Sequence, residues 1–482
     1  MPKQKKEKFN PTGFFRFRKL GKRYLLTNDI GDFVFLKEKE FNNFTQGKLK
    51  KGNHTYKELD QKHFSSESWN CEDCQARMTQ RYAWRHEYLN QGPSLHIIVV
   101  TLRCDHACIY CHASSKSMVR KDLDMTEKTA KKVVDMIFQT TSSDIIIEFQ
   151  GGEPLANFEV VKFITDYALK KNKKAKKKLR FSLVSTLTLL DNKKLNWLYS
   201  KKISVCSSLD GPEKLHNRNR PMINKKNGYS ITVQRIKKVK DKYRNLGYQV
   251  NALVTTTKYS LPFWKEIVDE YVKLGATGIH LRPLNPFGMA KNLQGVIGYT
   301  AEEFLKFYKK SLDYIIKLNI KGIKINERTA AMIIQKVFTD NDPNFLDLRS
   351  PCGAGIGQIA YHYNGDIYTC DEGRMIGQMG DQTFKMGNVY KNTYEEIMSS
   401  SVTKSLCVAS TLDGLTGCND CVYLPYCGVC PVFNYSEEKN IFAQSPNNFR
   451  CKVNKGILDY LFQKFENPKI LKIFKEWIGK DK

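Results

Sequence analysis

The chain lacks any run of 18 consecutive apolar residues, and no apolar segment stands behind its lysine-rich start. The first absence predicts that no helix crosses a membrane, and the second predicts that there is no secretory signal peptide. Disulfides are rare in proteins that stay in a reducing compartment. We therefore expect a cytoplasmic protein whose 14 cysteines serve purposes other than disulfides.

Acidic residues are also scarce. The chain has 49 Asp and Glu but 78 Lys and Arg, which gives a formal net charge of +29. Such a charge can bind nucleic acid. Its densest part is the segment 170–180, with eight basic residues in eleven, but no aromatic and basic RNA-binding motif is evident. We expect a solvated basic face and no nucleic-acid partner, and an acidic partner or RNA is the alternative.

Three cysteines fall within eight residues, directly after the apolar stretch Ile97–Leu102. Cys104, Cys108 and Cys111 form the pattern CxxxCxxC. Three thiolates can hold three irons of a [4Fe-4S] cluster and leave the fourth iron open, whereas a structural cluster normally uses four cysteines. The spacing indicates a reactive cluster, and a zinc site or buried free thiols are the alternative.

This spacing resembles the signature of the radical S-adenosylmethionine (SAM) superfamily. The resemblance implies that the open iron binds SAM and that an electron from the cluster cleaves SAM to a 5′-deoxyadenosyl radical. Gly151 and Gly152 precede Glu153 in a segment similar to the family's GGEP element, whose carboxylate binds the SAM amino group. An ordinary Gly-Gly turn is the alternative.

Other positions complete the SAM site that the resemblance implies. Ser208 and Asp210 stand in a segment similar to the family's SlDGp element, near the SAM ribose and carboxylate. Tyr110 in the cysteine loop and Arg282 at the end of the last predicted strand are further candidates for contacts with SAM.

Apolar, β-branched runs alternate with helical patterns between residues 97 and 320, which predicts six β/α units. Parallel strands joined by right-handed crossovers close into a partial barrel whose strand ends meet at one mouth. The predicted strands are Ile97–Leu102, Ile145–Phe149, Phe181–Ser185, Ile203–Leu209, Val250–Thr256 and Gly278–Arg282. The predicted helices are Thr126–Gln139, Asn157–Leu169, Ile231–Leu246 and Phe263–Leu274. The cysteine loop and the two SAM-binding segments all follow strands, so they should face one cavity.

Seven of the eight cysteines in the last third of the chain form a pattern that resembles the SPASM extension of peptide-modifying radical SAM enzymes. That extension holds two auxiliary [4Fe-4S] clusters, so the resemblance implies three clusters in all. It assigns Cys418, Cys421, Cys427 and Cys451 to the outer cluster, and Cys352, Cys370 and Cys430 to the inner cluster. The inner cluster lacks a fourth cysteine, so it has an open iron or uses Cys407 or His362. Zinc ribbons are the alternative.

The sequence therefore predicts an α/β fold with three domains and a tail. These are an N-terminal small α+β domain (1–92), a partial (β/α)6 radical SAM barrel (93–322), an iron-sulfur SPASM domain (323–455) and a helical tail (456–482).

The N-terminal part has a pattern of its own. The segment Tyr24–Leu36 predicts two strands around a glycine turn, and helices are expected near Lys37–Gly47 and Tyr56–Phe64. This winged-helix-like pattern resembles the RiPP recognition element, which binds leader peptides as an added strand, and a structural cap is the alternative. Cys71 and Cys74 have the spacing of half a metal site without a partner pair nearby, so a zinc or redox role is one interpretation and no such role is the alternative.

These resemblances predict a radical SAM enzyme that abstracts hydrogen from a ribosomally made peptide and installs an oxidative modification or cross-link. The segments Leu281–Gly288 and Tyr426–Pro431 resemble the B-type maturase of the His-Xaa-Ser systems. That resemblance implies a His-Xaa-Ser peptide and a second radical SAM protein as partners, and a ferredoxin or flavodoxin would supply the low-potential electron.

Asp371 directly follows Cys370 and matches the catalytic base of anaerobic sulfatase-maturating relatives, whereas a surface aspartate is the alternative. Two other classes of function stay open: an RNA-modifying radical SAM enzyme and a non-catalytic iron-sulfur partner of a second maturase.

Overall fold

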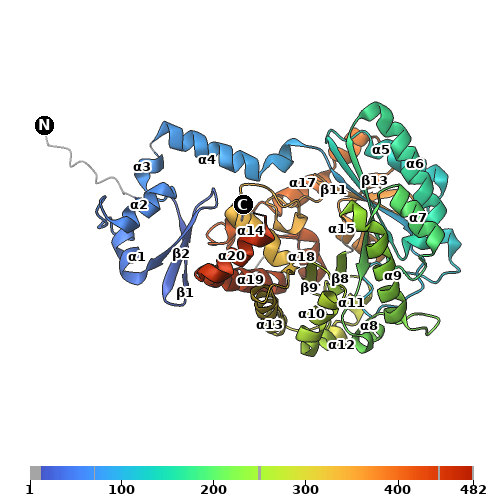
Figure 1. Cartoon of the computed structure of the whole chain (residues 1–482). Coiled ribbons are helices and arrows are strands. Elements are labelled where there is room, and N and C mark those ends of the chain that lie inside the picture. Colours follow the sequence, from blue (N-terminus) through green and yellow to red (C-terminus); the bar gives the residue numbers. More distant parts are fainter. Residues whose placement is uncertain (1–11, 70, 248–250, 443–445, 480–482) are drawn as a thin grey trace.

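The computed structural model describes residues 12–69, 71–247, 251–442 and 446–479. Ten of its strands form one sheet, in the order β10-β9-β8-β7-β6-β5-β4-β11-β12-β13. A separate three-stranded antiparallel sheet lies near the N-terminus, and the long helix α4 (Glu72–Arg85) leads from it toward the large sheet (Figure 1). Within the described ranges, no helix is both long and apolar enough to span a membrane.

The predicted parallel sheet is confirmed by six strands that neighbour one another in chain order. They are β4 (Leu95–Thr101), β5 (Asp144–Gly151), β6 (Lys178–Val184), β7 (Ser204–Ser208), β8 (Asn251–Thr255) and β9 (Gly278–Arg282). Their bounds differ from the predicted ones by at most three residues at either end. Val250, which begins the fifth predicted strand, lies outside the described residues.

Strand β5 shows why these segments are strands. Ile145, Ile147 and Phe149 are fully buried, whereas Glu148 and Gln150 between them are half-buried. Successive side chains of a strand point to opposite faces, so the apolar set packs under the helices and the polar set faces the barrel interior.

Helices cover the outer face of the barrel strands (Figure 1). They are α5 (Glu127–Ile137), α6 (Phe158–Ala175), α7 (Asn192–Ser200), α8 (Glu213–Asn219), α9 (Gly228–Tyr243), α10 (Trp264–Lys273) and α13 (Ala301–Ile320), with the short α11 (Met289–Asn292) and α12 (Gln294–Ile297) before the last. The sequence pattern did not reveal α7 and α8, and it ended the second helix at Leu169. Lysine favours helices, and basic side chains stabilise a helix C-terminus, so the first lysines of the basic run extend α6.

The C-terminal part continues the same sheet. Strand β11 pairs with β4 in parallel, with Gln358 opposite Leu95. The elements of the C-terminal part are β10 (Asn326–Glu327), α14 (Arg328–Phe338), β11 (Gln358–Tyr361), β12 (Asp366–Tyr368), α15 (Asp371–Gln378), β13 (Lys385–Asn388), α16 (Tyr394–Met398), α17 (Ser401–Val408), α18 (Pro431–Glu438), α19 (Phe449–Phe465) and α20 (Pro468–Trp477). Helix α19 runs across residue 455, which the sequence pattern had placed at a domain boundary.

The N-terminal part contains the two predicted strands and one more. Its elements are β1 (Arg16–Leu20), β2 (Arg23–Thr27), β3 (Phe33–Lys37), α1 (Glu38–Thr45), α2 (His54–Gln61) and α3 (Ser66–Trp69). The predicted glycine turn is present, because Asn28 N donates to Asp32 O at 3.2 Å and Gly31 has φ +80°. Strand β1, which the pattern did not predict, has three charged residues among its five.

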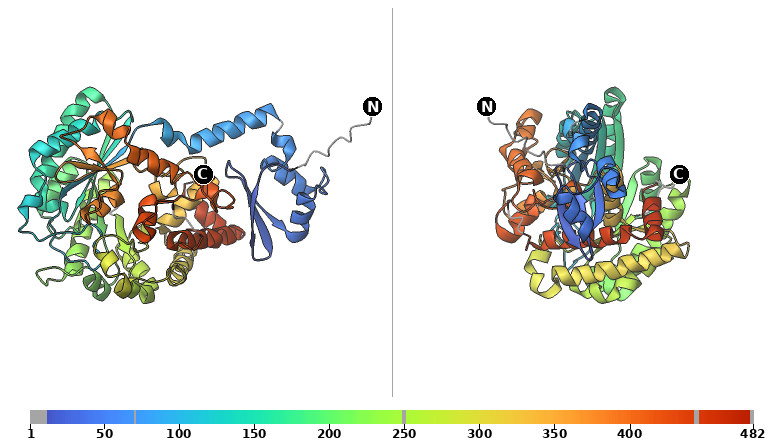
Figure 2. Two further views of the ribbon diagram at one scale, coloured as in Figure 1. Left: turned by 180° about the vertical axis from the view of Figure 1, so that it is seen from behind. Right: turned by 90° about the vertical axis from the view of Figure 1, so that its left-hand side faces the viewer.

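Aromatic packing joins this small sheet to the C-terminal helices, which lie beside it in both views of Figure 2. The Phe33 ring lies 5.2 Å from that of Phe462 on α19 and 5.9 Å from that of Phe338 on α14. Arg18 adds a two-point contact, since its guanidinium donates to both carboxylate oxygens of Asp459 at 3.0 Å. The small sheet is therefore attached to the C-terminal helices by side-chain contacts, in addition to its covalent connection through α4.

The small sheet also contacts the segment that carries the outer cysteines. Thr27 Oγ1 donates to Val422 O at 2.7 Å, and Tyr426 Oη donates to Gly31 O at 3.0 Å. Arg16 Nε donates to Asn419 O. Three contacts thus join the small sheet to residues between and beside Cys418, Cys421 and Cys427.

Replacing Phe33 with alanine should weaken the attachment of the small sheet. We expect a loss of about 2–3 kcal/mol in stability, because a half-buried ring leaves a cavity among other rings. Thermal unfolding and limited proteolysis of the N-terminal part measure this loss. Phe17→Ala is the control, since Phe17 is 53% exposed, and equal losses in both variants would contradict the proposed packing.

Candidate active site

The loop that carries the three clustered cysteines packs directly on the Gly151-Gly152 pair. Gly152 N donates to Thr101 O at 2.9 Å, and Glu153 N donates to Arg103 O at 2.7 Å. A Cβ added to Gly152 would lie 2.3 Å from Arg103 O, and Gly151 has φ +146°. Only glycine permits this close approach of two backbones.

The thiols of this loop lie in a largely buried place at the end of β4. Cys104 is 5% exposed, and Cys108 and Cys111 are half-buried. Burial raises the pKa of the Cys104 thiol, and it raises the pKa of Cys108 to about 12. Iron binds thiolates, and its positive charge favours loss of these protons. The site therefore suits a metal cluster better than free thiolates.

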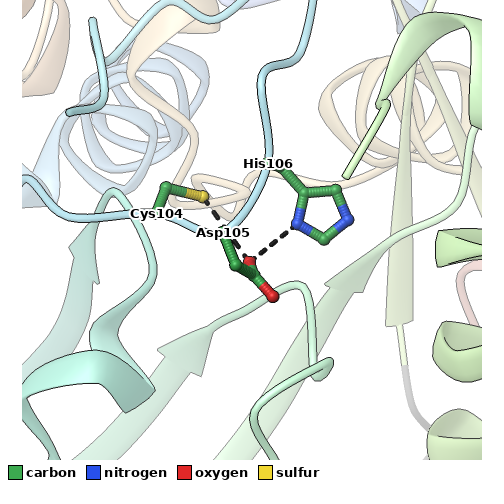
Figure 3. Close-up of side chains that lie close together, drawn as sticks. All are labelled: Cys104, Asp105 and His106. Atoms are coloured by element: carbon green, nitrogen blue, oxygen red, sulfur yellow. Dashed lines mark hydrogen bonds and ion pairs between the residues drawn. The ribbon is translucent and has the colours of Figure 1, made fainter. Parts of the chain in front are cut away.

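Two residues between the cysteines fasten the loop (Figure 3). Asp105 Oδ1 lies 2.8 Å from His106 Nδ1 and 4.0 Å from Cys104 Sγ. Thr188 Oγ1 donates to Asp105 Oδ2 at 2.6 Å. Burial alone would raise the Asp105 pKa, but the hydrogen bonds from His106 and Thr188 hold it below its ordinary value. The sequence pattern did not identify these partners, because Thr188 is distant in the chain.

Glu153 is fully buried and accepts four hydrogen bonds. Leu155 N and Ser185 Oγ donate to Oε1 at 3.0 and 2.7 Å, and both the N and the Oγ1 of Thr186 donate to Oε2 at 2.7 Å. Burial raises its pKa. Ser185 and Thr186 were not assigned to the site from sequence, yet they orient its acidic residue.

A buried network joins the cysteine loop to the end of β7. Tyr110 Oη donates to Asp210 Oδ2 at 2.7 Å, and Arg220 Nη1 donates to Tyr110 Oη at 2.8 Å. Burial raises the pKa of Asp210. The sequence pattern missed Arg220, which follows α8. The network brings Tyr110 and Asp210 together, and their contact with SAM stays a prediction.

Ser208 and Arg282 occupy the last positions of β7 and β9, and both are half-buried. The carboxyl ends of parallel strands meet at one edge of a sheet. The two side chains therefore lie at the same end of the barrel as the cysteine loop.

The outer group of cysteines lines one cavity. Its volume is about 50 Å³, and its lining includes the four assigned cysteines Cys418, Cys421, Cys427 and Cys451 together with Cys430, which the sequence assigns to the inner cluster. All four are half-buried. Burial raises the pKa of Cys418 to about 12 and of Cys427 to about 11. The structure thus brings together the four residues that the sequence assigned to one cluster.

The inner group is more deeply buried. Cys352, Cys370 and Cys430 are 4%, 3% and 5% exposed and pack in one apolar cluster. Cys370 caps α15, where Gly373 N donates to its sulfur at 3.3 Å, and Cys430 caps α18, where Phe433 N donates at 3.4 Å. Two helix N-termini therefore point at these sulfurs, and such N–H groups stabilise thiolates.

One group of possible metal ligands lies close together in the described part of the chain. The ligand atoms of Cys104, Asp105 and His106 all lie within 4.8 Å of one another, whereas no three cysteine sulfurs of the described residues do.

Asp371 is buried and is not a surface residue. It is the first residue of α15, and its Oδ1 accepts from Arg374 Nε at 2.7 Å. Cys71 and Cys74 stand apart from the other cysteines, at the start of α4 beside the small sheet (Figure 1). Arg77 Nη2 donates to Cys74 Sγ at 3.1 Å.

Comparison with known sequences supports this site. A model of the Radical SAM superfamily matches residues 98–259, which include the cysteine loop and Glu153. An uncharacterized protein of Methanocaldococcus jannaschii is 32% identical over 192 residues, which are 39% of this chain and 62% of that protein, so the match spans less than two thirds of that relative. The cysteine-type anaerobic sulfatase-maturating enzyme of Clostridium perfringens is 22% identical over 376 residues, which are 76% of this chain and 95% of that enzyme.

Comparison with solved structures shows the same fold. Native anSMEcpe with bound AdoMet aligns with a TM-score of 0.66 at 19% identity, over 80% of this chain and 100% of that one. Streptococcus suis SuiB bound to precursor peptide SuiA aligns with a TM-score of 0.51 at 15% identity, over 89% of this chain and 96% of that one.

The barrel, the three-cysteine loop at the end of its first strand and the superfamily model that matches residues 98–259 indicate a radical SAM enzyme. The chain is similar in sequence to the anaerobic sulfatase-maturating enzymes and shares its fold with SuiB.

Gly152→Ala should displace the cysteine loop, because the added Cβ meets backbone rather than a flexible side chain. We expect the anaerobically reconstituted variant to hold about four fewer irons per chain, the content of one cubane. Iron and sulfide analysis measures this loss. Gly295→Ala is the control, since a Cβ there meets no atom within 4 Å. Full iron content in the Gly152 variant would show that the loop tolerates the change.

Proposed function

We propose that this enzyme modifies a ribosomally made peptide or protein, by abstracting hydrogen and installing an oxidative modification or cross-link. The observation that carries the proposal is the gathering of ten cysteines into three groups, two of which adjoin at Cys430. One group lies on the barrel loop, and two lie in the C-terminal part that continues the barrel sheet. Both the sulfatase-maturating relative and the peptide-bound SuiB structure align over most of this chain.

The assignment of cofactors follows the three groups. Cys104, Cys108 and Cys111 hold the cluster that binds SAM, the outer group holds the second cluster, and the inner group holds the third. When bound, the first cluster supplies the electron that cleaves SAM to a 5′-deoxyadenosyl radical. The residues of the chain position SAM and substrate: Glu153 binds the SAM amino group, and Gly151 and Gly152 let backbone approach the ligand.

Asp371 is the proposed base of the reaction. It stands one residue after a ligand of the inner cluster, and its pairing with Arg374 fixes the direction of its carboxylate. A base at this position can take the proton that a substrate radical releases on oxidation.

The proposed substrate is a His-Xaa-Ser peptide, and the proposed partner is a second radical SAM protein. The resemblance of Leu281–Gly288 and Tyr426–Pro431 to B-type maturases supports this choice. The sheet β1-β2-β3 followed by three helices agrees with a recognition element for a leader peptide. A ferredoxin or flavodoxin would deliver the electron.

Anaerobic reconstitution tests the enzyme directly. We expect about twelve irons per chain for three cubane clusters, and we expect the dithionite-reduced protein to convert SAM to 5′-deoxyadenosine and methionine. Chromatography of the products measures the cleavage. Absence of 5′-deoxyadenosine would refute the proposed SAM-cleaving activity. About four irons per chain would refute the presence of the two auxiliary clusters.

Asp371→Asn should separate SAM cleavage from peptide modification. We expect cleavage to persist while the modified product falls by about 10²-fold or more, the usual effect of losing a general base. Mass spectrometry of a peptide encoded beside this gene and co-expressed with the protein measures the product. Asp413→Asn, at an exposed position, serves as the control. An unchanged product yield in the Asp371 variant would show that Asp371 is not the base of the reaction.

A further inference from the structure

The sulfur of Cys111 has two hydrogen-bonding groups beside it, and both belong to Ser115. The backbone N of Ser115 donates to Cys111 Sγ at 3.4 Å, and Ser115 Oγ lies 3.3 Å from the same sulfur. Within the described part of the chain, this hydroxyl has no other hydrogen-bond partner. The sulfur of Cys104 differs, because it lies 4.0 Å from a carboxylate oxygen of Asp105, which cannot donate (Figure 3).

The direction of the bond between the hydroxyl and the sulfur depends on the state of Cys111. A protonated thiol donates its S–H to Ser115 Oγ, whereas a thiolate bound to iron has no proton and can only accept. A serine hydroxyl rotates and can donate as well as accept. With a cluster in place, Cys111 Sγ therefore accepts from both the N–H and the O–H of Ser115.

The backbone between these two residues is strained. Ser114 has φ +52°, which lies in the left-handed region that costs energy for a residue other than glycine. Such strain persists where the surrounding structure holds the chain. Cys111 O accepts from Met289 N at 2.9 Å, and a Cβ added to Gly288 would lie 2.4 Å from the same oxygen. The loop after β9 thus fixes the start of a strained turn whose end brings Ser115 back to the sulfur.

We infer that the hydroxyl of Ser115 donates to the Cys111 thiolate when the cluster is bound and makes that cluster easier to reduce. This inference rests on the proposed assignment of Cys104, Cys108 and Cys111 to the cluster that binds SAM. Reduction adds one electron from a low-potential donor, and no bond to Ser115 forms or breaks. The reduced cluster carries one more negative charge, so a hydrogen bond to a ligand sulfur stabilises the reduced form more than the oxidised form. Ser115 is therefore a positioning residue that acts through Cys111.

The experiment is an anaerobic redox titration of the full chain, reconstituted with iron and sulfide and followed by electron paramagnetic resonance. The cluster that binds SAM gives the signal whose shape changes when SAM is added, and the signals of the other clusters serve as an internal reference. We expect about twelve irons per chain in the parent. A parent without any signal that responds to SAM would refute the proposed SAM cluster, and this inference with it.

Ser115→Ala removes the hydroxyl and keeps the backbone N–H. At the midpoint potential of the parent, we expect the ratio of reduced to oxidised SAM cluster to fall about tenfold, which is a shift of about 59 mV for a one-electron couple. Ser115→Thr keeps a hydroxyl and should titrate like the parent. Ser117→Ala, at an exposed position two residues further on, is the matched control and should also titrate like the parent.

Two results would overturn the inference while leaving the cluster in place. One is a Ser115→Ala variant that holds about twelve irons and titrates at the potential of the parent. The other is an equal shift in Ser115→Thr and Ser115→Ala, because only the first retains the hydroxyl. If Ser115→Ala loses about four irons, full iron content and the parent potential in Ser115→Thr support the hydrogen bond, and a loss of iron in both variants refutes it.

Discussion

The parallel pairing of β4 with β11 is the interaction on which the arrangement of the sites depends. Strand β4 runs into the loop of Cys104, and β11 leads through β12 to Cys370. Because the two strands are hydrogen-bonded neighbours, the barrel loop and the inner cysteine group are held by one rigid sheet. The spacing between the barrel loop and the inner cysteine group is therefore set by backbone hydrogen bonds, not by the docking of separate domains.

The barrel interior is polar, and this follows from the same strands that make the core. Glu148 on β5 accepts from Gln150 Nε2 at 2.6 Å and from Ser182 Oγ on β6 at 2.9 Å. Burial raises the pKa of Glu148. On β5, alternation sends Ile145, Ile147 and Phe149 outward to the helices and Glu148 and Gln150 inward. The interior thus suits a substrate that offers hydrogen bonds, as a peptide does.

The sequence was sufficient for features that depend on local pattern and on spacing. Strands such as Ile145–Phe149 are apolar and β-branched, and the cysteine spacing predicts metal ligands without any knowledge of the fold. Thr188, Ser185 and Arg220 escaped prediction because their contacts arise only when the sheet order brings distant loops together. Strand β11 was not predicted for a related reason. All four of its residues are buried, so it shows no alternation, and its partner is more than 250 residues away in the chain.

The contacts between the small sheet and the outer cysteine segment have a consequence for the descent of such enzymes. Thr27, Gly31 and Arg16 bind backbone or side-chain atoms of the segment that carries Cys418, Cys421 and Cys427. Recombination that exchanged the N-terminal part alone would remove the groups that hold this cysteine segment in shape. The two parts are therefore expected to be inherited together.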